Sequence, residues 1–511
     1  METGLLLSIW RGCRVSQASG GTKLRHEPNR GPLYWGDAMT APYYSERLRR
    51  YATAMRNEKP DRVPIRPFAA EFAAKYAGYT CQQATHDFAP ALEAARRCAA
   101  DFGWDATVGN MIYVWTGLTE AIGLNYYAAP GIHIPPDVGF QYREPAEDKA
   151  HMGPDEYDAL IADPTGFLFN VWLPRVSRDV APIGGPATYR NNLSFLKGGM
   201  AMLHYFTALG AQNESLKSEC GVVPAIGGIL KAPLDILGDK LRGYYGLTND
   251  LIEQPEKVLA ACHALMPHLA HVALTSADPE KLAPIAIWMH RGGVPFVTPH
   301  HFETVYWATL RPILDLLWAN GYQVLLYAEG DWTPHLERFA ELPEGSIIFH
   351  LDRTDPKQAH HVLHDRFCLS GGFPNTLLAR GTAAEVRDTC KRLIDELGAD
   401  GGYIMDASAI IQNDAEVENV RIMTEFTKEY GVYPESQAAP LPMARPVNAD
   451  RIAALARDFS FPGPAPGLCI PWEVKRPELA QITGDEALVK RVWEDIEGFA
   501  YTYIWHCLVS F

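Results

Sequence analysis

The chain alternates short, nearly all-apolar runs with longer amphipathic stretches, and this alternation limits the possible folds more than any other feature. Helical patterns separate the later runs, for example at 302–321 and 383–398. Strands buried on both faces lose the usual polar alternation, so the pattern predicts a parallel sheet covered by helices. The predicted strands are 105–112, 222–228, 285–289, 294–299, 323–329, 346–351, 367–372 and 402–406.

Eight such strand and helix units favour an α/β fold of the (β/α)8 TIM barrel type, with a doubly wound sheet as the alternative. The chain has no G-x-G-x-x-G after a strand and no P-loop, which disfavours a nucleotide-binding sheet. We expect a flexible leader at 1–40, a barrel at 41–437, and a linker with a C-terminal helical extension at 438–511. Whether translation starts at Met1 or Met39 is left open.

Charge and cysteine usage exclude several classes of protein. The formal net charge is −15 and no Lys/Arg run occurs, which argues against a nucleic-acid partner. Nine cysteines without a C-x-x-C pair indicate reduced thiols in a cytoplasmic protein. The apolar C-terminal segment is shorter than the ~20 residues of a membrane span. We expect it to be the buried end of a terminal helix, and we expect no membrane association.

Polar residues at the ends of the predicted strands are the first candidates for a site. The apolar run from 323 ends in Glu329, and a carboxylate at a core strand end needs a metal, a cation or a proton beside it because its unpaired burial is costly. His350, in the next run, suits acid–base work or support of a metal ligand. Asp331 and Asp406 are weaker candidates.

The order of several motifs resembles that of the uroporphyrinogen decarboxylase superfamily. The motifs are "EKPDRVPI", "DFGWDATVGNMIYVWTGLTEAIGL" and, most specifically, the segment 367–423 that runs from "FCLSGGFPNTLLARGT" to "AEVENVRIM". The resemblance covers about 47–432 and implies a (β/α)8 barrel with its site at the carboxyl ends of the strands. Decarboxylases of the family carry an Arg-Gln-Ala-Gly-Arg motif after the first strand, which 62–76 lacks. Asp105 could still stand in for their catalytic aspartate.

The other main branch of the superfamily is the cobalamin-dependent methyltransferases, and the resemblance is closest to this branch. These enzymes hold zinc through a His-x-Cys pair at one strand end and a later Cys. Here the pair reads Tyr327-Ala328-Glu329, and the later Cys is absent from 371–376. A rebuilt zinc site would take one ligand from each of three strand ends, and we expect His301, Glu329 and Cys368. The choice between His300 and His301 is left open. Such a site suits an ether or phenolate oxygen better than a thiol.

Each proposed ligand also has an ordinary structural explanation. The two histidines could simply begin a helix, and Cys368 could be a small core residue. Aromatic residues near the strand ends predict a pocket for a flat or apolar substrate. The expected substrate-binding residues are Tyr113, Trp115, Trp288, Tyr306 and Trp332, and the expected catalytic residues are Glu329, Asp105, His350 and Tyr327.

The sequence therefore predicts a zinc-dependent methyltransferase that moves a methyl group between a small O-methylated, aromatic or apolar substrate and cobalamin. The chain lacks the Asp-x-His-x-x-Gly motif of corrinoid proteins, so a separate corrinoid protein would carry the cobalamin. The alternatives are a metal-free decarboxylase-like lyase that uses Asp105 with Glu329 or His350 for proton transfer, and a non-catalytic barrel subunit of a methyltransferase complex. The substrate, the direction of transfer and a homo- or hetero-oligomeric state are left open.

Overall fold

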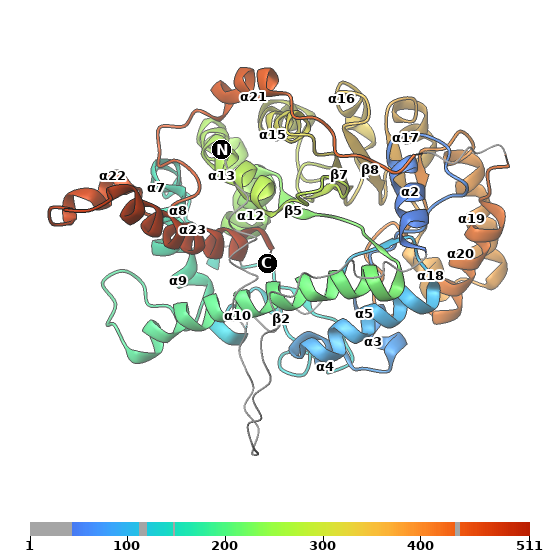
Figure 1. The fold of residues 1–511 in the computed structure, drawn as a ribbon, viewed down its shortest axis with the longest axis horizontal. Coiled ribbons are helices and arrows are strands. Elements are labelled where there is room, and N and C mark those ends of the chain that lie inside the picture. The colour runs from blue at the N-terminus through green and yellow to red at the C-terminus, as the bar shows by residue number, and fades with distance from the viewer. Residues whose placement is uncertain (1–42, 112–119, 147–148, 435–439, 511) are drawn as a thin grey trace, which may run out of the picture.

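A parallel sheet forms the centre of the molecule in the computed structural model, which describes residues 43–111, 120–146, 149–434 and 440–510 (Figure 1). Its six strands are β5 (Gly228–Lys231), β6 (Ile285–Met289), β7 (Val324–Ala328), β8 (Ile347–Leu351), β9 (Cys368–Gly371) and β10 (Tyr403–Ile404). They lie in the order β10-β9-β8-β7-β6-β5, all parallel. This order follows the chain without the reversal of a doubly wound sheet. The predicted leader lies outside the described residues.

Backbone hydrogen bonds continue beyond both edges of this sheet. Next to β10, the Arg66 amide donates to Met405 (3.0 Å), and the Asp105 amide donates to Ile65 (2.9 Å). Beyond Asp105, β1 (Ala106–Thr107) pairs in parallel with β4 (Val223–Pro224). The Gly227 amide, just before β5, then donates to Pro284 (2.8 Å). The predicted strands at 105–112 and 222–228 are therefore real but shorter than expected.

One predicted strand is wrong, and one short pair of strands was not predicted. The segment 294–299 forms turns, apart from an isolated antiparallel bridge between Val294 and Asp331. Its prolines have no N–H to donate to a ladder. The antiparallel pair β2 (Tyr127–Ala128) and β3 (Gln141–Tyr142) lies outside the central sheet.

Helices surround the sheet. Those before β5 are α2 (Tyr44–Met55), α3 (Glu71–Ala77), α4 (Cys81–His86), α5 (Phe88–Phe102), α7 (Tyr157–Ala162), α8 (Pro164–Phe167), η2 (Leu168–Trp172), α9 (Leu173–Val176), α10 (Tyr189–Ser215) and η3 (Leu216–Cys220). Those between β5 and β8 are α11 (Pro233–Ile236), η4 (Leu237–Arg242), α12 (Gly243–Glu253), α13 (Pro255–Ser276), α14 (Pro299–His301), η5 (Phe302–Trp307), α15 (Ala308–Ala319), η6 (Thr333–His335) and α16 (Leu336–Ala340). The later ones are α17 (Pro356–Leu363), α18 (Asn375–Arg380), α19 (Ala383–Leu397), α20 (Val417–Tyr430), α21 (Ala449–Leu455), η7 (Ala456–Phe459), α22 (Trp472–Lys475), η8 (Arg476–Glu478) and α23 (Glu486–Ser510).

The two faces of the sheet belong to two separate hydrophobic clusters. On β7, Val324 and Leu326 point outward into the cluster shared with the helices. Leu325 and Tyr327 point inward, where they meet Phe68 and Trp288. Successive strand residues alternate between faces, and both faces here are buried. This double burial explains why the predicted strands read as continuous apolar runs.

The C-terminal extension packs against the body of the molecule. The end of α23 is buried, and Trp505 is fully inaccessible to solvent. Its indole stacks on His268 at 4.7 Å, and its Nε1 donates to Thr165 Oγ1 (3.1 Å). The prediction of a buried terminal helix is confirmed. Among the described residues, one helix, α13, is long and apolar enough to cross a membrane, and 67% of its most apolar window is buried inside the protein.

Trp505→Ala should lower the free energy of unfolding by about 3–5 kcal/mol, because it removes a buried aromatic side chain and leaves a cavity. Chemical denaturation followed by circular dichroism measures the change. Ile252→Ala on α12 is the control, since Ile252 is 73% exposed and should change stability by less than about 0.5 kcal/mol. Equal stability of the two variants would contradict the docking of α23.

Candidate functional site

A cavity of about 290 Å³ lies where four neighbouring strands end. Lys231 is the last residue of β5, His290 and Glu329 directly follow β6 and β7, and Arg353 follows β8. Side chains just beyond the carboxyl ends of parallel strands meet at one edge of the sheet. The residues that line the cavity are Tyr127, Tyr142, Lys231, Asp239, Lys240, His290, Arg291, Phe296, Glu329, Gly330 and Arg353.

His290 lies between two acids, one on each side of its ring. Its Nδ1 lies 2.7 Å from Asp239 Oδ2, and its Nε2 lies 3.4 Å from Glu329 Oε2. Burial and the nearby Lys231 lower the pKa of His290, but the two carboxylates outweigh them and raise it to about 9. His290 is therefore an imidazolium at neutral pH.

Asp239, on the π-helix η4, joins three cations of the site. It accepts from Lys231 Nζ (2.7 Å) and Arg291 Nε (2.7 Å) as well as bonding to His290. Burial alone would raise the pKa of Asp239, but these cations hold it well below its usual range. A carboxylate with this many charged donors stays ionised and fixes their positions.

A second acid, Asp235, holds the backbone beside His290. Its Oδ1 accepts the amides of His290 (3.2 Å) and Arg291, and its Oδ2 accepts the Tyr306 hydroxyl (2.9 Å). The chain that follows β6 is thus bonded both through its backbone and through its side chains. The position of the His290 ring is therefore set before any ligand binds.

Lys240 is a buried lysine at the cavity wall. Its Nζ lies 4.7 Å from the centre of the Tyr126 ring, and the residue is only 2% exposed. Burial, with the neighbouring charge of Lys231, lowers the pKa of Lys240 well below its usual value. Lys231, His290, Arg291 and Arg353 line the same cavity as Lys240.

Glu329 lies in the cavity as the sequence predicts, although it is not a deeply buried carboxylate. Its side chain is 50% exposed at the strand end and pairs with His290. Burial raises its pKa, but the bond to His290 outweighs this and lowers it. The following turn is fixed because the Gly330 amide donates to Asp352 Oδ2 (2.8 Å).

The predicted zinc ligands His301, Glu329 and Cys368 do not converge. Cys368 pairs in register with Ile348, next to Leu325, so it lies four residues below Glu329 along the strand direction, or about 13 Å. His301 ends α14 and does not line the cavity. The described residues contain no group of three His, Cys, Asp or Glu side chains placed to hold a metal ion. These three residues therefore do not fit a zinc ion.

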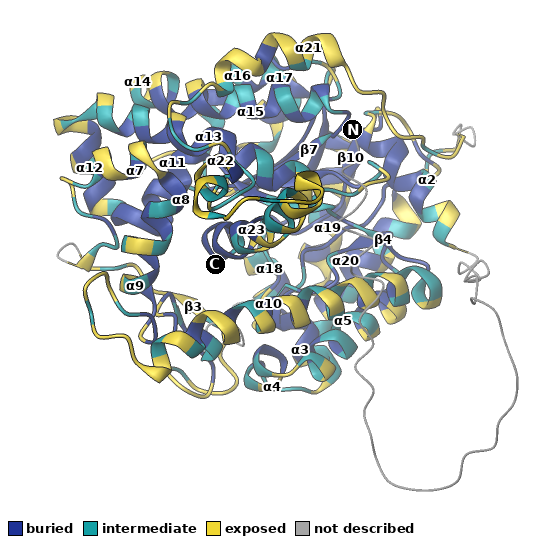
Figure 2. Cartoon of the chain, turned by 60° about the vertical axis from the view of Figure 1, so that its left-hand side comes forward, coloured by how far each residue is buried: buried dark blue, intermediate teal, exposed yellow. Residues whose placement is uncertain are grey.

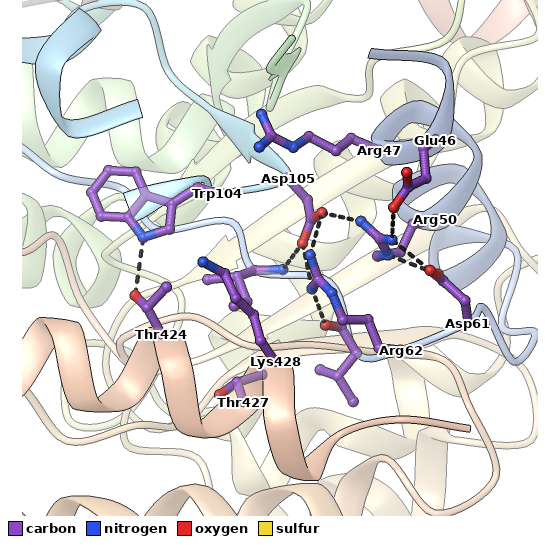
Figure 3. A network of polar contacts seen from close by, with 12 residues as sticks. Glu46, Arg47, Arg50, Asp61, Arg62, Trp104, Asp105, Thr424, Thr427 and Lys428 are labelled. Atoms are coloured by element: carbon purple, nitrogen blue, oxygen red, sulfur yellow. Dashed lines mark hydrogen bonds and ion pairs between the residues drawn. The ribbon is translucent and has the colours of Figure 1, made fainter. Parts of the chain in front are cut away.

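Asp105, predicted to be catalytic, directly precedes β1, whereas the cavity lies beyond the carboxyl ends of the strands. Figure 3 shows the polar network around its carboxylate. Its carboxylate accepts from Arg50 Nη1 (2.6 Å), both Nη atoms of Arg62 (2.9 Å each) and the Ile65 amide (2.9 Å). Both oxygens are used in this buried network. This corrects the prediction, because Asp105 has a structural role and no path to the cavity residues.

The other predicted catalytic residues, His350 and Tyr327, face the interior of the sheet and not the cavity. The two rings stack at 4.2 Å, and His350 Nδ1 lies 3.1 Å from Ser370 Oγ. Arg66 Nη2 donates to Ser370 Oγ (3.0 Å) and Asp406 Oδ2 (3.1 Å) in the same cluster. Burial and Arg66 lower the pKa of His350 well below its usual value. A neutral, enclosed His350 is a packing residue, which corrects its predicted role.

The predicted aromatic pocket is also corrected. Trp288 stacks on Tyr327 inside the sheet at 4.7 Å, while Tyr306 and Trp332 are fully buried behind the site. Tyr113 and Trp115 lie outside the described residues. Sequence reasoning missed the aromatic lining of Tyr127, Tyr142 and Phe296. It also missed His290, although this residue ends an apolar run in the same way as Glu329.

The sequence from residue 194 to residue 430 matches the family model of uroporphyrinogen decarboxylase (URO-D). This segment, slightly less than half of the chain, is similar to that family. The resemblance predicted from the motifs is thereby confirmed, and the matched segment contains β5 to β10. No protein of curated function is significantly similar to the chain. Among solved structures, a methyltransferase from Methanosarcina mazei is similar with a TM-score of 0.49 and 15% identity, over 75% of this chain and 98% of that one.

Asp105→Asn should destabilise the protein by about 3–5 kcal/mol, because it leaves the buried Arg50 and the partly buried Arg62 without their shared carboxylate. Denaturant unfolding measures this loss. Asp61→Asn is the matched control, since Asp61 also bonds to Arg50 but its side chain is 53% exposed. We expect a change of about 1 kcal/mol or less there. A stable Asp105 variant would contradict the structural role.

His290 should titrate near pH 9, as measured by NMR of protein labelled with ¹³C-histidine. Asp239→Asn should lower this midpoint by about one unit or more, because it removes the closer carboxylate. Because the pKa of His290 is raised in the folded state, its contacts with the carboxylates stabilise the fold fully at pH values below the ordinary histidine pKa. This stabilisation is lost as the pH rises through about 9. Asp331→Asn is the control, because Asp331 caps Thr333 and does not contact His290. A midpoint near 6.5 in the unmodified protein would contradict a charged His290 held between Asp239 and Glu329.

Proposed function

We propose that this chain is a methyltransferase of the URO-D superfamily that moves a methyl group between a small methylated substrate and a corrinoid carried by a separate protein. The observation that carries the proposal is the Asp239–His290–Glu329 group at the carboxyl ends of the strands of the URO-D domain. It provides a positioned proton donor at the edge where parallel-strand enzymes bind their substrates.

The proposal includes a closed (β/α)8 barrel. In support, the Arg66 amide donates to Met405 on one side of this segment, and Ile65 accepts from the Asp105 amide on the other side. Further along, β1 pairs with β4, and the Gly227 amide donates to Pro284. Together with the six-stranded sheet, these contacts support the closure that we propose. Phe68 and Trp288 would then lie in the barrel interior, where the second hydrophobic cluster is found.

Decarboxylation of a tetrapyrrole fits the same residues less well. The segment 62–76 lacks the arginine motif of that branch, and Lys231 and Arg291 are already bonded to Asp239. A substrate with many carboxylates needs several free cations. Asp105, the candidate acid of the lyase alternative, is used in a structural network away from the cavity.

His290 would act on the substrate oxygen. When a methyl group leaves an ether, the oxygen keeps the electron pair of the broken C–O bond and gains negative charge. The imidazolium of His290 can donate its Nε2 proton to that oxygen, and the neutral ring can take the proton back in the opposite direction of transfer. A Co(I) corrinoid, when bound by the partner, supplies the electron pair that accepts the methyl group.

The acids around His290 hold and tune its ring. Asp239 bonds Nδ1, so the Nε2 side faces the cavity and Glu329. Glu329 keeps the ring charged between reactions and can rotate away because its side chain is half exposed. Since His301, Glu329 and Cys368 do not fit a zinc ion, no step is assigned to zinc.

The cavity also indicates the kind of substrate and the place of the corrinoid. Its aromatic lining of Tyr127, Tyr142 and Phe296 suits a flat or apolar group such as an aryl methyl ether. A corrinoid is far too large for a cavity of about 290 Å³, so the partner would have to present it at the cavity entrance.

Methyl transfer from a panel of methoxylated compounds to Co(I) cobalamin, followed by the absorption change of the corrinoid, tests the proposal. His290→Asn should lower kcat by about 100-fold or more, because it removes the proton donor. The rate of the unmodified enzyme in the demethylation direction should fall as pH rises through about 9, when His290 loses its proton. Glu329→Gln should shift this decline to lower pH.

His300→Asn is the control, because His300 is exposed on α14 and does not line the cavity. Full activity of the His290 variant would contradict the proposed role of His290. Release of CO₂ from a carboxylated substrate, with no methyl transfer, would support the lyase alternative. Activity only after addition of a second barrel protein would support a non-catalytic subunit.

A further inference from the structure

The two lysines of the cavity differ in their partners. Lys231 Nζ donates to Asp239 Oδ2 (2.7 Å) and lies 3.2 Å from His290 Nδ1. Lys240 Nζ lies 4.7 Å from the centre of the Tyr126 ring, and it forms no hydrogen bond or ion pair within the part of the chain that the structure describes. One lysine is therefore held by a carboxylate, whereas the amine of the other is left over.

The amine of Lys240 is open to the cavity. The residue lines the cavity, and its Nζ is not one of the fully enclosed polar atoms that lack a partner. Since the whole residue is only 2% exposed, the amine reaches the cavity and not the outer surface. Buried polar groups normally have a hydrogen-bond partner, so an unpartnered amine at a cavity wall points to a ligand.

The backbone that carries Lys240 is fixed from several sides. All six residues of η4 are buried, and Figure 2 draws this turn in dark blue between α11 and α12. The Lys240 carbonyl accepts from the Tyr126 hydroxyl and from Trp172 Nε1 (2.9 Å each). The Asp239 carbonyl accepts from the Tyr142 hydroxyl (2.8 Å). These bonds hold a π-helical turn, a conformation that is frequent at functional sites.

The surroundings of Lys240 favour a neutral amine. Burial, together with the charge of Lys231, lowers its pKa well below the usual value. Asp239 opposes this effect, but its carboxylate is already shared by Lys231, His290 and Arg291. The face of the Tyr126 ring attracts an ammonium ion without replacing the hydrogen bonds that burial removes. Lys240 therefore offers a lone pair to a ligand.

Several other titratable or charged groups surround the amine. Burial lowers the pKa of His151 to about 4, so this ring is neutral beside Tyr126. The groups that line the cavity with Lys240 are Tyr127, Tyr142, His290, Arg291, Glu329 and Arg353.

We propose that Lys240 is a nucleophile that takes up a small aromatic aldehyde or ketone as an imine in this cavity. A neutral lysine needs an electrophilic carbon, and the charged His290 can supply a proton to the carbonyl oxygen. Both groups line one cavity of about 290 Å³, small enough for a single ring-sized ligand to touch both. The aromatic side chains of Tyr127 and Phe296 suit a flat ring.

The imine forms in two balanced stages. The lone pair of Lys240 Nζ forms a bond to the carbonyl carbon, the π electrons move to oxygen, and the oxygen takes the Nε2 proton of His290. The nitrogen then returns one of its own protons to His290. In the second stage the nitrogen lone pair forms the C=N bond, and the hydroxyl group leaves as water with a proton from His290. The iminium proton returns to His290, so the products are a neutral imine and water.

Reductive trapping with benzaldehyde and sodium cyanoborohydride at neutral pH tests the proposal. The hydride converts the imine into a stable benzylamine, so the intact mass of the full chain should rise by one benzyl group. Peptide mapping should place this group on Lys240, at an occupancy at least 100-fold above that of Lys257. Lys257 is the comparison because its side chain is 41% exposed and pairs with Asp158 (2.7 Å).

Lys240→Met keeps the length of the side chain and removes the amine, so it should abolish the single benzyl label while the circular dichroism spectrum stays unchanged. Lys257→Arg is the matched control and should retain the label on Lys240. If Lys240→Met does not fold, the peptide map of the unmodified protein still decides the site.

The pH dependence of labelling separates Lys240 from an ordinary lysine. Below the pKa of an amine, the fraction in the reactive neutral form falls about tenfold per pH unit. From about pH 8 to about pH 7, labelling of exposed lysines should therefore fall about tenfold, whereas labelling of Lys240 should fall by less than about twofold.

Absence of the benzyl group from Lys240, equal labelling of Lys257, or an unchanged single label in Lys240→Met would overturn the proposal. The inference goes beyond methyl transfer, because benzaldehyde carries no methyl group and imine formation needs no corrinoid. Loss of one activity with retention of the other would show which of the two proposals fails.

Discussion

The ionised carboxylate of Asp239 is the interaction on which the site depends. It joins Lys231 at the end of β5, His290 and Arg291 after β6, and its own π-helix η4. Removing a carboxylate from three cations would leave them to repel one another in a mostly buried space. The shape of the cavity and the charge on His290 therefore have the same origin.

The sequence was most informative about the parallel sheet. Runs such as 285–289 and 323–329 were predicted correctly because both faces of β6 and β7 are buried, which produces an unmistakable apolar run. The run 294–299 has a similar composition but contains two prolines, and it forms turns. Composition alone does not distinguish a strand from an apolar turn when prolines remove the donors of the ladder.

The site was only partly predictable. Glu329 is predictable because it ends an apolar run, and His290 ends another apolar run in the same way. Cys368 also lies on a strand, but its depth along the strand direction separates it from the cavity, and the side chain of His350 faces the interior of the sheet. That depth follows from the register of neighbouring strands, which a single sequence does not contain. Asp105 likewise depends on long-range pairing with Arg50 and Arg62.

The position of Glu329 beyond the last residue of β7 has a consequence for how such a domain can change its chemistry. Leu325 and Tyr327 pack in the interior of the sheet, whereas the half-exposed side chain of Glu329 lies at the cavity. Substitutions there remove the pairing with His290 but no packing contact of the sheet. A protein lineage can therefore exchange the reactive group at this strand end while the sheet beneath it stays the same. In this chain the exchangeable position is Glu329, which directly follows β7.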